Sequence, residues 1–294
     1  MSLPTTSVMK PSKEKFFAAL GEIEKFSPAP VILSSAMKLL RDPHSDLESI
    51  ATLVGRDTAL MADLLRCANS AYYGGEKSTT VFQAVQKIGL RETMRLLNLA
   101  VARIVSGRDL ACYGIHGTDF WSESLFNGLF MHVLARETNG TDPEEAYTAG
   151  LLRFIGRLAI NQTLENLHGG LFWDKQESIS QWELENVGLM QAEAGALLLA
   201  KWRFPEATVL AVGAQDAPAT LAEGNWLADA LYFSSALLPH GLGTPCLAEI
   251  GPTWEASPIV GEFINRHDLS TEAVNTMLQA TSTAFEEIRV NFGA

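Results

Sequence analysis

The chain has 294 residues, and its 22 Lys and Arg against 34 Asp and Glu give a formal net charge of −12. A broad DNA or RNA interface needs an excess of basic side chains, so this balance argues against nucleic acid as a partner. Apolar residues make up 47% of the chain and charged residues 19%, which is typical of a well-packed globular protein and excludes a disordered one.

The first third of the chain predicts short helices separated by turns. Ser45 and Glu48 have the spacing of a capping box, and the apolar stripe behind them ends at Gly55. Asp57 can cap the next helix, which we expect to end at Gly74-Gly75. That helix carries an apolar stripe predicted to face inward, formed by Met61, Leu64, Leu65, Ala68 and Tyr72.

A second capping box and a glycine stop define the following helix. Thr80 and Gln83 form the box, and the apolar spacing behind them is interrupted at Gly89. Apolar residues repeat again at helical spacing from 91 to 105. A glycine-containing break around 110–117 then separates the first helical block from the second.

The second block also predicts only helices. Phe120-Trp121 opens one, and Asp142-Pro143 starts another, with an N-cap aspartate and proline in the first turn. Ser180 to Glu183 marks a further start. Helices are also predicted over 191–202 and, beginning after Pro205, over 206–212.

The C-terminal part predicts an apolar helix near 226–238 and a final helix over 270–291. The final helix should dock on the body of the protein, because it would otherwise expose a large apolar patch. The residues of that patch are Val274, Met277, Leu278, Phe285 and Ile288. Since no segment alternates apolar and polar residues as a half-buried strand does, we predict an all-α fold.

Cysteine usage and hydropathy bear on the compartment. Cys67, Cys112 and Cys246 are far apart and form no Cys-x-x-Cys pair, which favours a reducing environment over a disulfide framework. The stretch 230–248 lacks charged residues, but prolines and glycines interrupt it, so it cannot form a membrane-spanning helix. We therefore expect a cytoplasmic protein that does not bind membranes.

Four sequence blocks stand out: Asp57 to Gly74, Phe82 to Leu90, Gly150-Leu-Leu-Arg-Phe-Ile-Gly-Arg-Leu158 and Gly188 to Pro205. Together they resemble the HDOD domain family. HDOD domains are bacterial signal-transduction domains distantly related to the HD metal-dependent phosphohydrolases. The resemblance covers about 16–218 and implies an HDOD-type multi-helix bundle with an HD-like helical subdomain.

This resemblance also suggests how the chain is divided. Residues 1–15 are expected to be a flexible N-terminus, followed by the HDOD domain over 16–218. Within the domain we expect an N-terminal helical lobe over about 16–108 and an HD-like lobe over about 118–218. Residues 219–294 would form a C-terminal helical extension packed on the HD-like lobe.

The resemblance places six positions where HD hydrolases carry metal ligands. They are Glu123, Arg153, Phe154, Gln191, Gln215 and Asp216. HD chemistry needs imidazoles and carboxylates that converge on divalent ions. Only Glu123 and Asp216 could bind a hard cation, and Arg153 would add a positive charge among them. We therefore expect no bound metal, no cofactor, no catalytic residue and no phosphohydrolase activity.

Two functional hypotheses follow from such a degenerate site. The first is a non-catalytic signalling module that acts through contacts with other signalling proteins. The second is a sensor that binds a small anion or nucleotide in the former HD pocket, because arginine suits bidentate phosphate recognition. The candidate pocket residues are Trp121, Glu123, Arg153, Gln191, Gln215 and Asp216. Alternatively, Arg153 pairs with Glu123 or Asp216 and simply fills the site.

A candidate partner surface lies beside the inward stripe of the helix after Asp57. It consists of Arg66, Asn69, Ser70 and Tyr73. Arginine and tyrosine are enriched at binding hot spots, which favours recognition. In the alternative account, Asn69 and Ser70 bond backbone groups near the helix end, and Tyr73 covers the edge of the core.

Overall fold

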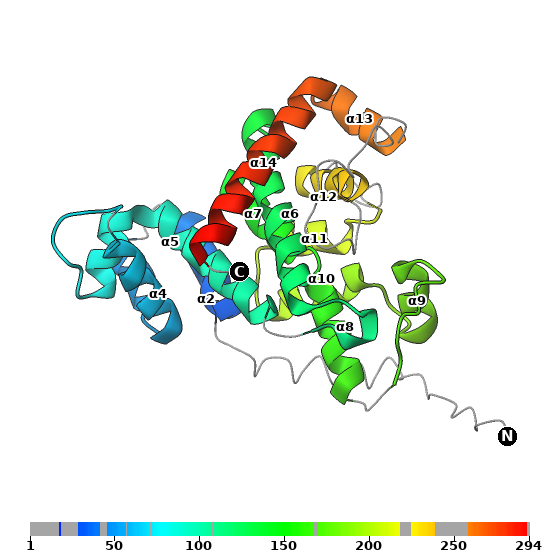
Figure 1. Ribbon diagram of the computed structural model, residues 1–294, viewed down its shortest axis with the longest axis horizontal. Helices are drawn as coiled ribbons and strands as arrows, with labels where there is room; N and C mark the ends of the chain where they lie inside the picture. The colour runs from blue at the N-terminus through cyan, green and yellow to red at the C-terminus, as the bar shows by residue number, and fades with distance from the viewer. Residues whose placement is uncertain are drawn as a thin grey trace.

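The computed structural model describes residues 18, 29–41, 46–56, 58–70, 72–106, 109–166, 170–217, 225–238 and 258–292. Helices dominate these ranges, and apart from an isolated bridge between Leu110 and Ile115 they contain no β-structure (Figure 1). The all-α prediction is confirmed. The segment 1–15, Ser45 and Asp57 lie outside the described residues.

Four helices form the N-terminal part: α2 (Ala29–Arg41), α3 (Leu47–Val54), α4 (Thr58–Ala68) and α5 (Val81–Ser106). The predicted start of α3 is displaced by one residue. Asp46 is the N-cap, and its carboxylate accepts a hydrogen bond of 2.7 Å from the backbone N–H of Ser49. Asp46 directly precedes the first helical residue, so it takes the role assigned to Ser45.

Helix α5 begins with the predicted capping box and breaks at the predicted glycine. The backbone N–H of Gln83 donates to Thr80 Oγ1 (3.2 Å), and the side chain of Gln83 accepts from the N–H of Thr80 (3.3 Å). Gly89 has φ 82° and ψ 168°, a non-helical conformation that glycine adopts without steric cost. The second part of α5, from Leu90, therefore takes a new direction.

The central part of the chain contains the 3₁₀ turn η2 (Ala111–Tyr113) and six α-helices. They are α6 (Gly117–Thr138), α7 (Pro143–Leu152), α8 (Ile155–Asn166), α9 (Ile179–Asn186), α10 (Gln191–Lys201) and α11 (Glu206–Gly213). Asp142 caps α7 as predicted, accepting from the N–H groups of Glu144 and Glu145. Helix α9 begins at Ile179 rather than Ser180, because Ser178 accepts from the N–H of Gln181 and acts as the cap.

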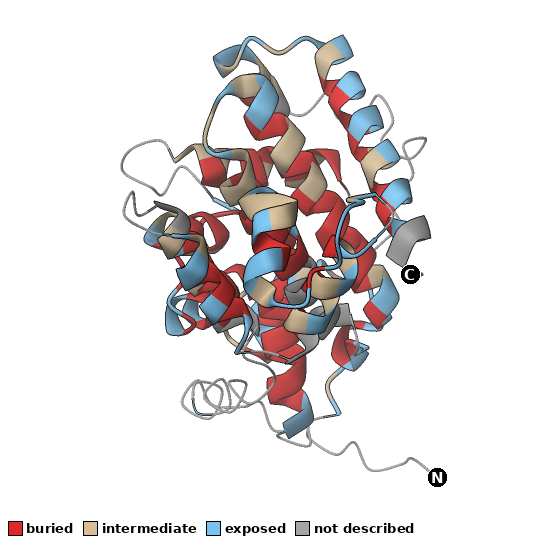
Figure 2. Cartoon of the chain, turned by 90° about the vertical axis from the view of Figure 1, so that its left-hand side faces the viewer, coloured by how far each residue is buried: buried red, intermediate tan, exposed pale blue. Residues whose placement is uncertain are grey.

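The C-terminal part consists of α12 (Trp226–Leu237), α13 (Pro258–Arg266) and α14 (Thr271–Phe292). Helix α14 lies along α6, where the ring of Phe285 contacts Trp121 (6.4 Å) and Phe126 (5.8 Å between centroids) (Figure 1). The five apolar residues predicted to dock the final helix are all buried. Figure 2 shows the same pattern for the residues that the structure describes, with buried residues concentrated where helices face one another.

None of the described helices combines the length and the hydropathy that a membrane crossing requires. The boundaries of the lobes at 108, 118 and 218 stay a prediction.

Candidate functional site

Arg153 occupies the centre of a buried polar network. It follows α7 directly, and its side chain is completely buried. Its Nε donates to Gln215 Oε1 (3.2 Å), and its Nη1 donates to Asn127 Oδ1 (2.9 Å) and Ser234 Oγ (2.7 Å). The amide of Gln215 donates back to the carbonyl oxygen of Arg153 (2.9 Å). One guanidinium thus joins α6, the end of α11 and α12.

Glu123 forms an ion pair with Arg157, which the sequence analysis did not single out. Their charged groups lie 3.6 Å apart, and both side chains are buried. Arg157, four residues after Arg153 in α8, is thus the ion-pair partner of Glu123, whereas the hydrogen bonds of the Arg153 side chain go to Asn127, Gln215 and Ser234. Burial lowers the pKa of Arg153 to about 10, while the charges of Glu123 and Asp216 favour its protonated form. Arg153 is cationic at neutral pH.

Phe154 and the remaining candidate pocket residues have separate surroundings. The centroid of the Phe154 ring lies 4.6 Å from the Arg153 Cζ and 4.4 Å from the Arg157 Cζ. Trp121 faces α14 through Phe285. The N–H of Gln191 donates to Glu183 (2.7 Å), and Asp216 is exposed. The structure thus brings four of the candidate residues together: Arg153 contacts Gln215 and Phe154, and Arg157 contacts Phe154 and Glu123.

The candidate partner surface differs from the prediction at its helix end. Helix α4 ends at Ala68, so the helical spacing no longer applies to Tyr72, which is 88% exposed. The prediction that Tyr72 faces inward is wrong for this reason. Asn69 bonds both backbone groups of Ser78 (2.9 and 2.7 Å) and closes the loop that follows α4. The amide of Asn69 is thus used within the fold.

The other residues of this surface are more accessible. The side chain of Arg66 is 73% exposed and lies 2.9 Å from Asp63. Ser70 donates its backbone N–H to Cys67. Tyr73 is half-buried, and burial raises its pKa to about 12; its ring meets the edge of Tyr72 at 5.0 Å. Arg66 and the Tyr72–Tyr73 pair are therefore the parts of this surface that a partner could reach.

The pattern of the HDOD domain matches residues 27–218. The chain belongs to the HDOD domain family. Its fold is also found in an HDOD domain protein of unknown function from Geobacter sulfurreducens, with a TM-score of 0.62 and 18% identity over 95% of this chain and 97% of the other.

Two further crystal structures share this HDOD fold. A candidate signal transduction protein from Marinobacter aquaeolei VT8 has a TM-score of 0.68 and 20% identity, covering 98% of this chain and 67% of the other. A candidate phosphohydrolase from Shewanella amazonensis SB2B has a TM-score of 0.59 and 21% identity, covering 92% and 93%. At these identities the likeness concerns the fold.

A curated relative also matches, an uncharacterized protein from Treponema pallidum that is 25% identical over 215 residues. The match covers 71% of this chain but 41% of the relative, so the chain spans about two fifths of that protein's length.

The residues at the positions where the resemblance places the HD metal ligands do not fit a divalent metal ion. Arg153, which the resemblance places at the first position of the His-Asp pair, has its guanidinium held in place by three side chains. A cation placed there would meet a buried positive charge and groups already engaged in hydrogen bonds. In the part of the chain that the structure describes, no three His, Cys, Asp or Glu side chains are grouped as metal ligands would be.

Glu183 adds a second buried carboxyl group near the polar network around Arg153. It accepts a hydrogen bond from the Tyr113 hydroxyl (2.9 Å) and one from the N–H of Gln191. Burial raises the pKa of Glu183 to about 7, although the Gln191 N–H, the charge of Arg157 and the Tyr113 hydroxyl each act to lower it. Neither Glu183 nor Tyr113 was a candidate, because nothing in the sequence shows that a helix-start glutamate is buried.

We predict that this carboxyl group makes stability depend on pH. The native pKa of about 7 exceeds the ordinary value of 4.5, so the folded state holds the proton more tightly than the unfolded state. The contribution is complete below pH 4.5 and is lost as pH rises from 4.5 through the folded pKa of about 7, by about 3 kcal/mol. In the Glu183→Gln variant, the free energy of unfolding should no longer fall over this pH range.

The exposed Glu185 on the same helix supplies the matched control, Glu185→Gln. Urea denaturation of the three proteins between about pH 5 and pH 8 measures the difference directly. A wild-type protein and a Glu183→Gln variant with parallel pH profiles would contradict the shifted titration.

Proposed function

We propose that this chain is a non-catalytic bacterial signal-transduction module that acts in the cytoplasm through contacts with other proteins. The observation that carries the proposal is the Arg153 guanidinium, buried and bonded to Asn127, Gln215 and Ser234 at the position of the former HD pair. A side chain anchored in this way serves packing and leaves no place for ligand exchange. Membership of the HDOD family and the likeness to a candidate signal transduction protein support the signalling role.

Restoring the His-Asp pair of the HD hydrolases should not produce phosphohydrolase activity. Arg153→His with Phe154→Asp refills two ligand positions, yet Gln191 and Gln215 remain weak neutral ligands. We expect no hydrolysis of bis(p-nitrophenyl) phosphate with Mn²⁺ or Fe²⁺, by the wild-type protein or by the double variant.

Elemental analysis of the purified wild-type protein provides a test that does not depend on how well the double variant folds. It should find no stoichiometric Fe, Mn, Ni or Zn. Turnover above background in either protein, or a stoichiometric metal in the wild type, would overturn the proposal.

A ligand sensor is the second candidate, and unsatisfied buried atoms support it. Arg153 Nη2, Arg157 Nε and Gln191 Oε1 are buried without a hydrogen-bond partner. Buried polar atoms of this kind cost stability, and an anion would satisfy the two guanidinium donors. A dose-dependent rise in melting temperature with inorganic phosphate or nucleotides would favour the sensor. We place it second because Arg153 already has three partner side chains.

The exposed end of α4 is where we expect a partner to bind. Arg66→Ala and Tyr72→Ala remove side chains that are 73% and 88% exposed, so melting should change little. Capture of a partner identified by affinity purification and mass spectrometry should weaken strongly, because arginine and tyrosine dominate binding energy at hot spots.

The matched control is Asn69→Ala, which opens the loop bonded to Ser78 and should lower stability instead. Full capture by both surface variants would show that this end of α4 serves the fold alone.

A further inference from the structure

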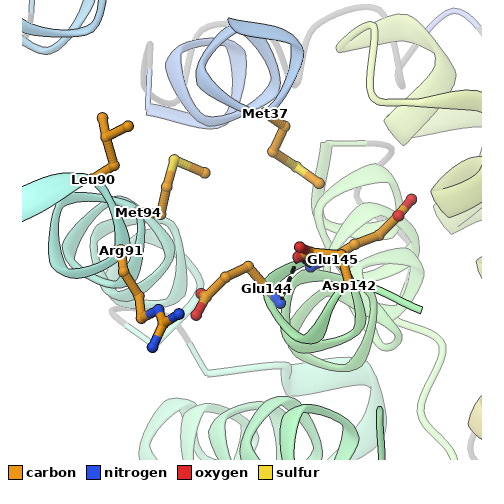
Figure 3. A pocket seen from close by; sticks show the side chains of 7 residues that line it. All are labelled: Met37, Leu90, Arg91, Met94, Asp142, Glu144 and Glu145. Carbon is orange, nitrogen blue, oxygen red and sulfur yellow. Dashed lines mark hydrogen bonds between the residues drawn. The ribbon is translucent and has the colours of Figure 1, made fainter. Parts of the chain in front are cut away.

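A cavity of about 310 Å³ lies between α2, the second part of α5 and the start of α7 (Figure 3). Its lining consists of Met37, Leu90, Arg91, Met94, Asp142, Glu144 and Glu145. We call it the α2–α5–α7 pocket. It is separate from the Arg153 network, and its volume is at the lower end of the range for ligand pockets, roughly 300–1,000 Å³.

The floor of the pocket is apolar. Met37 and Met94 are buried, and they extend toward the same space from α2 and α5 (Figure 3). Leu90, the first residue after the break at Gly89, adds to this floor. Methionine side chains adapt to irregular shapes, so such a floor suits an alkyl chain rather than one rigid ligand.

The rim of the pocket is acidic. The lining contains three carboxylates, those of Asp142, Glu144 and Glu145, and one guanidinium, that of Arg91. Glu144 Oε1 lies 3.5 Å from His132 Nε2. The chain as a whole carries a formal charge of −12, which also attracts cations. The electrostatics of the pocket therefore favour a positively charged occupant.

An anion finds no comparable site here, although the pocket includes a helix N-terminus. Asp142 already accepts hydrogen bonds from the N–H groups of Glu144 (2.9 Å) and Glu145 (3.1 Å). The donors that would otherwise bind phosphate are thus occupied by the chain's own carboxylate.

We propose that the α2–α5–α7 pocket receives an arginine or lysine side chain of a partner protein. The alkyl stem would lie on Met37 and Met94, and the cationic end would reach the carboxylates at the rim, in the way such side chains bury the stem and keep the charge at a polar edge. This inference rests on the proposed function, since it adds the chemistry of the partner to a module that acts by protein contacts.

The test uses n-butylguanidinium, which has the stem and head of an arginine side chain. The full chain is labelled with ¹³C at the methionine methyl groups, and Met37→Leu and Met94→Leu assign the two pocket signals among the eight methionines. Both signals should shift saturably with n-butylguanidinium. Butyrate and 1-butanol, which have the alkyl chain without the positive charge, should not reproduce the shifts.

The carboxylates are tested by Glu144→Gln combined with Glu145→Gln. We expect the affinity for n-butylguanidinium to fall about threefold to fivefold, as removal of partly exposed ion pairs does. Glu286→Gln with Glu287→Gln, which removes two exposed carboxylates from α14, should leave the affinity unchanged. Absent shifts, equal shifts with 1-butanol, or unchanged affinity in the pocket variant would each overturn the proposal.

Failure of the pocket proposal is distinguishable from failure of the proposed function, because binding of n-butylguanidinium requires neither a partner protein nor a metal. A titration without shifts would overturn the pocket proposal and would not affect partner capture through α4. Phosphodiester turnover by the wild-type protein would overturn the proposed function and leave a positive titration standing.

Discussion

Replacing Gly156 with alanine should lower the free energy of unfolding by about 3 kcal/mol or more. A Cβ at this position would lie 1.8 Å from the carbonyl oxygen of Gln191 and 2.7 Å from the N of Gly195. Both are backbone atoms of α10, so no rotation of a side chain relieves the clash, and α8 must move away from α10. For a chain of this size the melting temperature should fall by about 6–12 °C.

Two other glycines supply graded controls. Gly195→Ala brings a Cβ to 3.2 Å from Val212 Cγ1 and 3.3 Å from the N of Gly156, so its cost should be smaller. Gly170 is exposed, with no atom within 4 Å of an added Cβ, so Gly170→Ala should melt like the wild type. Equal melting of Gly156→Ala and Gly170→Ala would show that α8 and α10 pack less closely than the structure indicates.

The helices could be predicted because their ends depend on contacts within a few residues. Gln83 bonds Thr80 three positions earlier, and Asp142 bonds N–H groups two and three positions later. Where two neighbouring residues can both cap, sequence spacing alone does not choose between them. This explains the displacement from Ser45 to Asp46 and from Ser180 to Ser178.

The candidate site was predicted less completely, because its contacts join distant parts of the chain. The partners of Arg153 lie 26, 62 and 81 positions away, at Asn127, Gln215 and Ser234. Nothing in the local pattern distinguishes these polar residues from exposed ones. Arg157 lies only four positions after Arg153, but the chain passes from α7 to α8 between them, so helical spacing could not show that the two cations come together.

Tyr72 shows how one local error changes the expected surface. An apolar stripe continued past Ala68 places Tyr72 in the core, but the helix ends there and the side chain is 88% exposed. The bonds from Asn69 to Ser78 hold the chain in a loop instead. Side chains whose direction depends on such a loop could not be assigned from helical periodicity.

Deletion of α14, by truncation after Leu269, should abolish cooperative folding. Five apolar side chains of this helix are buried: Val274, Met277, Leu278, Phe285 and Ile288. At roughly 1.5–3 kcal/mol each, their burial contributes roughly 8–15 kcal/mol, as much as the whole stability of a typical domain. The truncated chain would also expose the face of α6 against which α14 packs. We therefore expect aggregation.

Phe285→Ala tests the same packing in the full-length protein. Phe285 is 2% exposed, and its ring contacts both Trp121 and Phe126. Replacing this side chain with that of alanine leaves a cavity between α14 and α6 and should lower the free energy of unfolding by about 3–5 kcal/mol. Gln279→Ala changes an exposed residue of the same helix and should be nearly neutral. Urea denaturation followed by circular dichroism measures both. Equal midpoints for the two variants would mean that α14 does not dock on α6, because a docked helix must distinguish its buried face from its exposed one.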